Sequence, residues 1–246
     1  MRSSRDIIVN IISDLHNGSS MSLCSLEPEI SDLDTTYRPN ALQREMNECW
    51  FECIDDLTGK ADYCVLNGEP IDGANKRQLG NQSWTTNLMD QVNDSVKLVK
   101  EIPYDNIIVN RGSGYHVQQD GTNFEEVFAD KIGAAKNRVF GGAGLTDYYC
   151  ILQAHGKNLN FTHHIGFNKW AAYRTTGLAR EMAGMVFEKD KMAKSDAIIR
   201  SHVHYFVHVE FTNTHGLTTP CWKYPDAHLF RGGLAGTTPD LSIIHI

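Results

Sequence analysis

The amino-acid sequence predicts an α/β fold in which a mainly parallel sheet is followed by closing antiparallel strands. The first half of the chain alternates short apolar runs with segments of helical periodicity. Each of these apolar runs ends in a polar turn that contains glycine, which is typical of right-handed βαβ units. The second half has strand-like runs closer together, which indicates antiparallel pairing.

The first predicted strand, residues 7–12, is a nearly continuous run of isoleucine and valine. Such a run fits a strand buried on both faces. Asp14 and His16 follow it directly, and alternate side chains of an extended chain point the same way. Ligands collect beyond the carboxyl ends of strands in sheets of this kind. A carboxylate and an imidazole in that place would form half of a metal site.

The remaining elements follow from periodicity and turn signals along the chain. Helices are predicted where apolar residues recur every three or four positions, at residues 42–57, 88–99, 124–132 and 170–192. The first of them is expected to stop at Gly59 and the third at Gly133. Further strands are predicted at residues 63–66, 106–109, 148–153, 158–162, 197–200, 206–212, 217–222 and 241–246. Residues 154–157 form a hairpin turn and residues 17–40 and 74–86 form loops. No linker interrupts the pattern, so we expect one domain over residues 1–246.

Composition excludes several classes of protein. The apolar fraction of 41% is typical of a soluble globular chain, and no apolar run approaches the roughly 18 residues that span a bilayer. The net charge of −7 argues against a non-specific nucleic-acid coat, although not against a nuclease with bound metals. The first residues lack a signal-peptide cleavage site, and none of the six cysteines forms C-x-x-C. We therefore expect reduced thiols in a cytoplasmic protein without a membrane anchor.

Metal-capable side chains follow five of the predicted strands. They are Asp14 and His16, Glu69 and Asp72, Ser113 and His116, His163 and His164, and His202 and His204. A single loop histidine is more often solvated or hydrogen-bonded than a metal ligand. Six of the 11 histidines fall at these strand ends, however, and this recurrence predicts one shared site.

The order of these motifs resembles the calcineurin-like metallophosphoesterase superfamily. The pattern of that family is D-x-H, G-D-x-x-D, G-N-H-D/E, a histidine after a strand, and G-H-x-H. The counterparts here are Asp14-Leu15-His16, Gly68-Glu69-Pro70-Ile71-Asp72, Gly112-Ser113-Gly114-Tyr115-His116, His163, and Ser201-His202-Val203-His204. The resemblance covers about residues 7–210 and implies a four-layer sandwich of two stacked mixed β-sheets flanked by helices. The departures from the pattern resemble the divergent members found in phage genomes.

The resemblance also implies the roles of individual residues. Two divalent transition-metal ions would be held by Asp14, His16 and His204, by His163 and His202, and by Glu69 as the bridge. Mn, Fe, Zn, Co or Ni suit such imidazole and carboxylate ligands better than Mg or Ca. His116 would stand near the leaving group and protonate it, and Asp72 would orient a ligand histidine.

Three departures from the family pattern bear on the metals. Glu69 stands where the family has aspartate, and Pro70 is expected to keep it extended. Ser113 takes the place of the metal-binding asparagine, and Asn110 is the alternative ligand. Ser201 replaces a glycine, for which a small residue is an adequate substitute.

The choice between His163 and His164 as ligand favours His163, because the family uses the first histidine after the strand. Arg111 would contact a phosphate or form a surface salt bridge. Cations beside aromatic residues would clamp phosphates and stack bases, or anchor loops, at Lys76, Arg77, Trp84, Lys169, Trp170 and Tyr173.

The function that the resemblance implies is metal-dependent hydrolysis of a phosphoester, such as a nucleotide or a nucleic-acid end. A diester is favoured over a monoester by family analogy alone. Two alternatives stay open at this stage. One is a metal-binding scaffold of the same fold without efficient turnover, and the other is a mononuclear zinc hydrolase that uses His16, His202 and His204.

Overall fold

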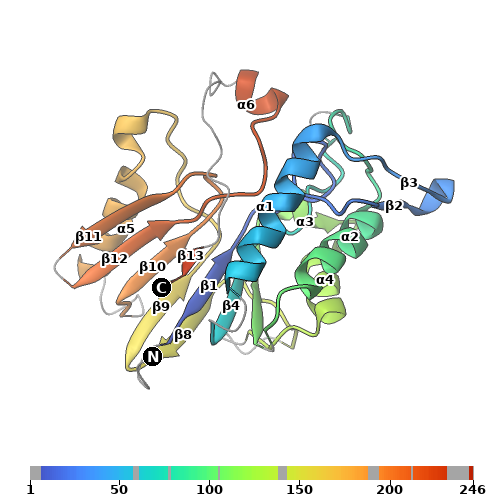
Figure 1. Ribbon diagram of the computed structural model, residues 1–246. Helices are drawn as coiled ribbons and strands as arrows, with labels where there is room; N and C mark the ends of the chain where they lie inside the picture. Colours follow the sequence, from blue (N-terminus) through green and yellow to red (C-terminus); the bar gives the residue numbers. More distant parts are fainter. Residues whose placement is uncertain are drawn as a thin grey trace.

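In the described part of the chain, a four-stranded and a five-stranded β-sheet face each other, with helices on both outer sides, and two further sheets have two strands each (Figure 1). This computed structural model describes residues 7–57, 61–76, 79–104, 106–137, 143–187, 194–211, 213–231 and 244–245. Helices α1 (Ala41–Leu57), α2 (Leu88–Lys100) and α4 (Phe124–Ile132) cover the first sheet, and α5 (Thr176–Phe187) covers the second. The four-layer sandwich predicted from the sequence is therefore confirmed.

The first sheet has the strand order β13-β1-β4-β5. Its three central strands, β1 (Val9–Ile12), β4 (Tyr63–Asn67) and β5 (Ile107–Asn110), are parallel, whereas β13 (Ile244–His245) pairs antiparallel with β1. Helices α1 (Ala41–Leu57) and α2 (Leu88–Lys100) lie between these strands in sequence, and α4 (Phe124–Ile132) follows β5. The carboxyl ends of β1, β4 and β5 consequently share one edge of the sheet.

The second sheet has the order β11-β12-β10-β9-β8. Its strands are β8 (Cys150–Ala154), β9 (Lys157–Phe161), β10 (Ala197–Arg200), β11 (Val207–Phe211) and β12 (Thr214–Thr218). The central strand β10 runs parallel to β9 and β12, and the two edge strands are antiparallel to their neighbours. Helix α5 (Thr176–Phe187) lies in the chain between β9 and β10.

Alternating side chains along the strands supply three apolar layers. In β4, Cys64 and Leu66 pack toward α1, α2 and α4, while Val65 packs between the two sheets. In β10, Ile199 faces the first sheet and Ile198 packs against α5. Because both faces of these strands are covered, their sequences are apolar at nearly every position.

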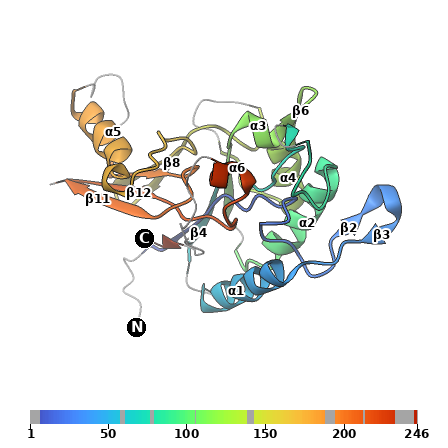
Figure 2. The ribbon, with the colours of Figure 1, turned by 90° about the horizontal axis from the view of Figure 1, so that it is seen from above.

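Several short elements escaped the sequence analysis because they are only two to five residues long. They are β2 (Glu29–Ile30), η1 (Ser31–Leu33), β3 (Thr35–Thr36), α3 (Gly114–Val117), β6 (Gln118–Gln119), β7 (Thr122–Asn123), η3 (Ala171–Tyr173) and α6 (Ala227–Arg231). The β2–β3 hairpin lies in the expected loop of residues 17–40 and projects from the body in both views (Figures 1 and 2).

Two predicted elements have different bounds. The helix expected at residues 170–192 begins at Thr176, because the Asn168 side chain accepts from the Trp170 amide and η3 occupies the chain between. Residues 188–193 and Gly59 lie outside the described residues. The strand expected at 217–222 is instead β12, which ends two residues before Pro220, a residue without an amide to donate.

All six cysteines are free thiols. Within the described segments, no helix combines the length and the apolar character that crossing a membrane requires.

Candidate metal centre

The polar residues that follow the strands meet where the carboxyl ends of the two sheets come together. The loop after β1 is bound to the loop after β4, because the amides of Asp14 and His16 donate to the carbonyls of Gly68 and Glu69, both at 3.1 Å. The loops after β9 and β10 are joined in the same way, by Ser201 N to His163 O at 2.8 Å. The two pairs of loops are linked by the His202 amide, which donates to Asp14 Oδ2 at 3.3 Å. Side chains up to 190 positions apart in the chain, from Asp14 to His204, thus come together.

A first group of ligand atoms comes from Asp14, His16, Glu69 and His204, all within 4.8 Å of one another. His16 Nε2 lies 3.0 Å from Glu69 Oε2 and 3.1 Å from His204 Nε2. His204 Nε2 lies 3.2 Å from Asp14 Oδ1. Two ligand atoms that each lie about 2.0–2.2 Å from one tetrahedral ion are roughly 3.3–3.6 Å apart, so these spacings are close to those of a metal site.

A second group comes from Glu69, His163 and His202. His163 Nε2 lies 3.1 Å from Glu69 Oε1, and His202 Nδ1 lies 3.9 Å from the same oxygen. The carboxylate of Glu69 therefore belongs to both groups, with a different oxygen toward each. His202 groups with His163 and not with His16 and His204, which disfavours the mononuclear arrangement considered from the sequence.

Two buried polar atoms of these groups make no hydrogen bond within the described part of the chain. They are Asp14 Oδ1 and His163 Nε2, on side chains with 0% exposed area. Their polar neighbours, His204 Nε2 at 3.2 Å and Glu69 Oε1 at 3.1 Å, form ion pairs with them without hydrogen-bond geometry. A buried polar atom that forms no hydrogen bond costs up to about 1–3 kcal/mol. A cation between these atoms would satisfy both, so the donor set fits a metal ion.

The backbone of the cluster adopts an unusual conformation. Five of its residues have positive φ angles, which are 53° at Asp14, 47° at His16, 58° at Glu69, 72° at His202 and 58° at His204. Such conformations cost about 1–3 kcal/mol each in non-glycine residues and cluster at functional sites. The left-handed turns aim these side chains into the common space between the sheets.

This finding corrects two expectations from the sequence. Asp14 and His16 do not continue the strand, because β1 ends at Ile12. Glu69 is not extended in spite of Pro70, because its amide donates to Glu125 Oε1 and its carbonyl accepts from His16. Tertiary hydrogen bonds override the local preference of a residue before proline.

The charges of the cluster favour a cation at its centre. Burial alone would raise the pKa of Asp14, but the imidazoles of His163 and His204 outweigh it and lower that pKa below its usual range. Burial would lower the pKa of His163, yet Glu69 and Asp14 raise it to about 9. The pKa of His204 is raised to about 10, against burial, by Cys221 and Asp14. The carboxylates thus stabilise positive charge, whether it is carried by protons or by metal ions.

Hydrogen bonds behind the ligands fix their orientation. His163 Nδ1 donates to Asn67 O at 2.7 Å, which leaves Nε2 free to face the cluster. His16 Nδ1 lies 3.1 Å from Asp72 Oδ1, a contact through which a carboxylate can orient an imidazole ring. The buried ammonium of Lys223 contacts the same Asp72 oxygen at 2.8 Å.

His116 lies beside the first group and not inside it. Its ring meets the ring of His16 edge to face, with centroids 4.7 Å apart, and its Nδ1 donates to Asp72 O at 2.7 Å. Burial lowers the pKa of His116 to about 4, so its imidazole is neutral at pH 7. The expected role as a proton donor therefore requires a bound phosphate to raise this pKa.

The remaining candidates are placed as follows. Ser113 approaches the cluster, with its hydroxyl and its amide on Glu69 Oε1. Asn110 is not available as a ligand, because its amide donates to Asn67 Oδ1 and Phe161 O and its oxygen accepts from Asn137.

Arg111 forms the salt bridge that was one of its two expected roles, to Glu126 at 3.4 Å, with a second contact to Thr146. His164 is exposed and its ring lies 4.5 Å from that of His202. Trp84 is buried and stacks on Tyr37, as expected for an aromatic that anchors a loop, whereas Arg77 lies outside the described residues.

Sequence reasoning missed two residues that support the centre. Glu125 accepts from the amides of Glu69 and Gly112 and thereby joins the turns after β4 and β5, and its burial raises its pKa to about 7. In the sequence it is an acid in the first turn of a helix after the N-cap Asn123, which predicts an exposed residue. Lys223 belongs to no motif, and no local signal marks it.

Two stacked mixed sheets with these motifs at their common edge form the arrangement that the sequence resemblance implies. The chain has the fold of the calcineurin-like metallophosphoesterase superfamily. Neither the family models nor the curated proteins include a match to the sequence.

Three solved structures illustrate the similarity of this chain's fold to known proteins. An archaeal phosphodiesterase is 10% identical, with 87% of this chain and 84% of that chain covered and a TM-score of 0.44. A predicted phosphoesterase from Streptococcus pneumoniae is 12% identical, with 98% and 83% covered and a TM-score of 0.41. Vps29 from Entamoeba histolytica in complex with Zn²⁺ is 11% identical, with 87% and 74% covered and a TM-score of 0.42. Because these likenesses are low, the functional argument rests on the site itself.

Proposed function

We propose that this protein is a metal-dependent phosphoesterase with two adjacent divalent cations. One ion would be held by Asp14, His16 and His204 and the other by His163 and His202, and Glu69 would contribute to both. The observation that carries the proposal is that the two oxygens of the Glu69 carboxylate face different histidines. Its Oε2 lies 3.0 Å from His16 Nε2, and its Oε1 lies 3.1 Å from His163 Nε2. The many imidazoles favour Mn, Fe, Zn, Co or Ni.

Metals bound there would polarise the phosphoryl group of a substrate and lower the pKa of a bound water, which would support phosphoester hydrolysis near neutral pH. The protein contributes the placement of the ligands. The amide and the hydroxyl of Ser113 both donate to Glu69 Oε1. Ser113 follows the glycine as the family's asparagine does, but it has no side-chain amide oxygen to offer a metal. Asp72 and Lys223 hold His16 from behind.

We assign His116 the position beside the reacting phosphoryl group. Its Nδ1–H is committed to Asp72 O, so only Nε2 can exchange a proton with a substrate. The negative charge of a bound phosphoester would raise the lowered pKa of this imidazole and let Nε2 protonate a leaving oxygen. General acid catalysis of this kind contributes roughly 10²–10⁴-fold in rate.

The test is a panel of p-nitrophenyl phosphate, bis-p-nitrophenyl phosphate and thymidine 5′-p-nitrophenyl phosphate, each with Mn²⁺, Ni²⁺ or Zn²⁺. We expect hydrolysis that a chelator abolishes and that His116→Ala lowers roughly 10²-fold or more without loss of bound metal. His155→Ala, which removes an exposed histidine in the β8–β9 turn, is the matched control and should retain full activity.

The same panel separates the two candidate functions. Two bound metals with no turnover of any ester, and no difference between wild type and His116→Ala, would overturn the enzyme and support the metal-binding scaffold. Failure to bind metal, in a protein that folds, would overturn both.

A further inference from the structure

A second group of metal-capable side chains lies on the β11–β12 hairpin, away from the centre described above. His208 and Glu210 are two residues apart on β11 and therefore share a face, and His215 is the register partner of Glu210 on β12. His215 is also the register partner of Ala197, at the start of β10. The residues of the central site instead follow Arg200, at the end of β10, so the two groups lie at opposite ends of the strands.

The spacing of the two imidazole nitrogens in this second group is close to that in a metal site. His208 Nε2 and His215 Nδ1 are 3.2 Å apart, and a carboxylate oxygen of Glu210 lies within 4.8 Å of both. Two imidazole nitrogens on one tetrahedral zinc ion, each at about 2.0–2.1 Å, would be roughly 3.3–3.4 Å apart. The two strands of the hairpin are joined by five residue pairs, which limits how far the three side chains can separate.

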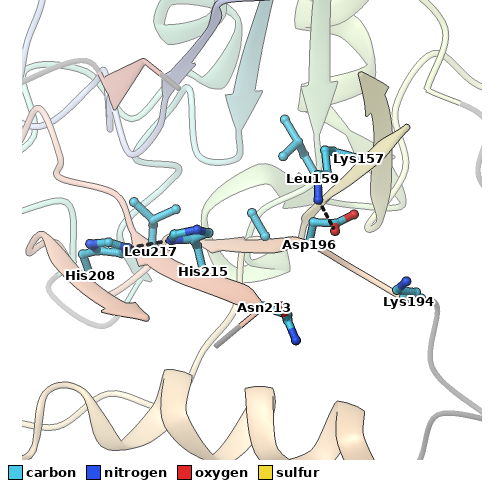
Figure 3. Close-up of a pocket in the computed structure, with 9 residues that line it drawn as sticks. Lys157, Leu159, Lys194, Asp196, His208, Asn213, His215 and Leu217 are labelled. Carbon is cyan, nitrogen blue, oxygen red and sulfur yellow. Dashed lines mark hydrogen bonds and ion pairs between the residues drawn. The ribbon is translucent and has the colours of Figure 1, made fainter. Parts of the chain in front are cut away.

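The other face of the hairpin is already occupied. Val207 and Val209, which alternate with the two ligand positions of β11, pack in the cluster formed with Leu178 and Met182 of α5. The imidazoles share the face of Leu217, which borders a pocket of about 840 Å³ (Figure 3). Lys157 and Asp196 form an ion pair across this pocket from the two histidines.

A hydrogen bond between the two imidazoles explains only part of the arrangement. All three side chains are exposed, so water would satisfy each of them and the net gain from a mutual hydrogen bond is small, about 0.5–1.5 kcal/mol. A hydrogen bond between the two imidazoles also leaves unexplained why the carboxylate of Glu210 lies opposite His215. Two imidazoles and one carboxylate are, in contrast, a common ligand set for zinc.

We propose that His208, Glu210 and His215 form a separate site for one divalent transition-metal ion of the zinc class. Three protein ligands leave a coordination position open toward the pocket, where water or an anionic ligand would complete the sphere. This site is independent of the central pair and of phosphoester hydrolysis.

The experiment is equilibrium dialysis of tag-free protein against Zn²⁺, followed by metal quantification. We expect the His208→Ala/His215→Ala double variant to bind one equivalent of zinc less than wild type, and His155→Ala to bind as wild type does. Glu210→Gln should weaken the additional site at least about tenfold, since even outer-shell partners of a metal contribute that much. In an Asp14→Asn/His163→Ala variant the central zinc should be lost and the hairpin zinc retained.

Equal zinc content and affinity in wild type and the double variant would overturn the proposal and leave a hydrogen-bonded pair of surface imidazoles. Thermal unfolding of the zinc-free proteins checks that each variant folds. If the double variant does not, the single variant His208→Gln, which keeps a polar side chain at this exposed position, gives the same comparison. Loss of the hairpin zinc has no bearing on phosphoesterase activity, so the two proposals fail separately.

Discussion

At the scale of single residues, the central cluster holds side chains and backbone in unfavourable conformations and environments, which the rest of the fold maintains. Its five left-handed residues and two buried atoms without hydrogen bonds are unfavourable in the metal-free protein. The strongly coupled charges of Asp14, Glu69 and His163 offset part of that cost. These features are explained together if the cluster is built to surround cations.

Metal binding should release protons. The pKa of His163 is raised to about 9, so this imidazole is protonated at pH 7.5 in the metal-free protein, whereas a metal needs the lone pair of Nε2. Below pH 9 each binding event therefore displaces protons, and the affinity should rise with pH until the imidazole is neutral. Calorimetric titration with Zn²⁺ in buffers of different ionisation enthalpy measures this release. An enthalpy independent of the buffer would contradict it.

Removal of the buried ammonium should destabilise the protein. Lys223 is 6% exposed and contacts Asp72 at 2.8 Å and Asp226 at 3.3 Å. Lys223→Met leaves buried carboxylates without their cation, and we expect a loss of about 3–5 kcal/mol in the free energy of unfolding, measured in urea.

Lys97→Met is the matched control for this substitution. Lys97 pairs with Glu29 at 2.8 Å, but the two side chains are 45% and 73% exposed. An exposed pair contributes at most about 1 kcal/mol, so this variant should unfold almost as wild type does. Equal effects of the two substitutions would show that Lys223 is not a buried partner of Asp72.

At the scale of secondary-structure elements, the turns after β4 and β5 are packed against each other without room for side chains. Gly68 has a φ of +91°, and a Cβ there would lie 2.5 Å from His163 Nδ1. A Cβ at Gly112 would lie 2.6 Å from Glu69 Cγ and 2.8 Å from Glu69 N. Together with the hydrogen bonds of Glu125, this contact sets the position of the shared carboxylate.

Gly112→Ala should displace Glu69 and weaken metal binding. Overpacking of this kind costs about 1–3 kcal/mol, and we expect both a lower free energy of unfolding and a lower metal content after dialysis. Gly184→Ala in α5, where a Cβ meets nothing within 4 Å, is the control and should stabilise the helix by about 0.5–1 kcal/mol. Wild-type metal content in Gly112→Ala would contradict the role of this close approach.

At the scale of the whole molecule, the ligands come from both sheets. Asp14 and Glu69 follow strands of the first sheet, whereas His163 and His202 follow strands of the second. Cations bound between these residues would connect the two sheets, in addition to the apolar side chains that already pack between them.

Chelation should therefore lower the thermal stability of the protein as a whole. A metal that binds only the folded state stabilises it by about 2.7 kcal/mol at 100 times its dissociation constant. We expect a lower melting temperature in EDTA than in excess Mn²⁺ or Zn²⁺, measured by circular dichroism at 222 nm. The difference should become smaller in an Asp14→Asn/His163→Ala variant, which keeps only the hairpin site, and an undiminished difference there would place the effect outside the central cluster.

Much of the fold is predictable from local patterns. The strands β1, β4, β5 and β10 appear as apolar runs, and α1, α2 and α4 as 3.6-residue periods, because burial on one or both faces depends on neighbours in the chain. The β6–β7 hairpin has a local signal, the Asp120-Gly121 turn with positive φ at both residues, but its strands of two residues are too short to show a period. The four residues of α3 are likewise too few to show a helical period.

The sequence by itself determined which segments along the chain are strands and which polar residues follow them, because both are properties of adjacent positions. Only the tertiary structure decided that Glu69 turns one oxygen toward each group of histidines, that Arg111 pairs with Glu126 outside the cluster, and that Lys223 reaches Asp72 from 151 positions away. These contacts depend on how two sheets pack together, and the free energy that selects them comes from partners that are distant in the chain.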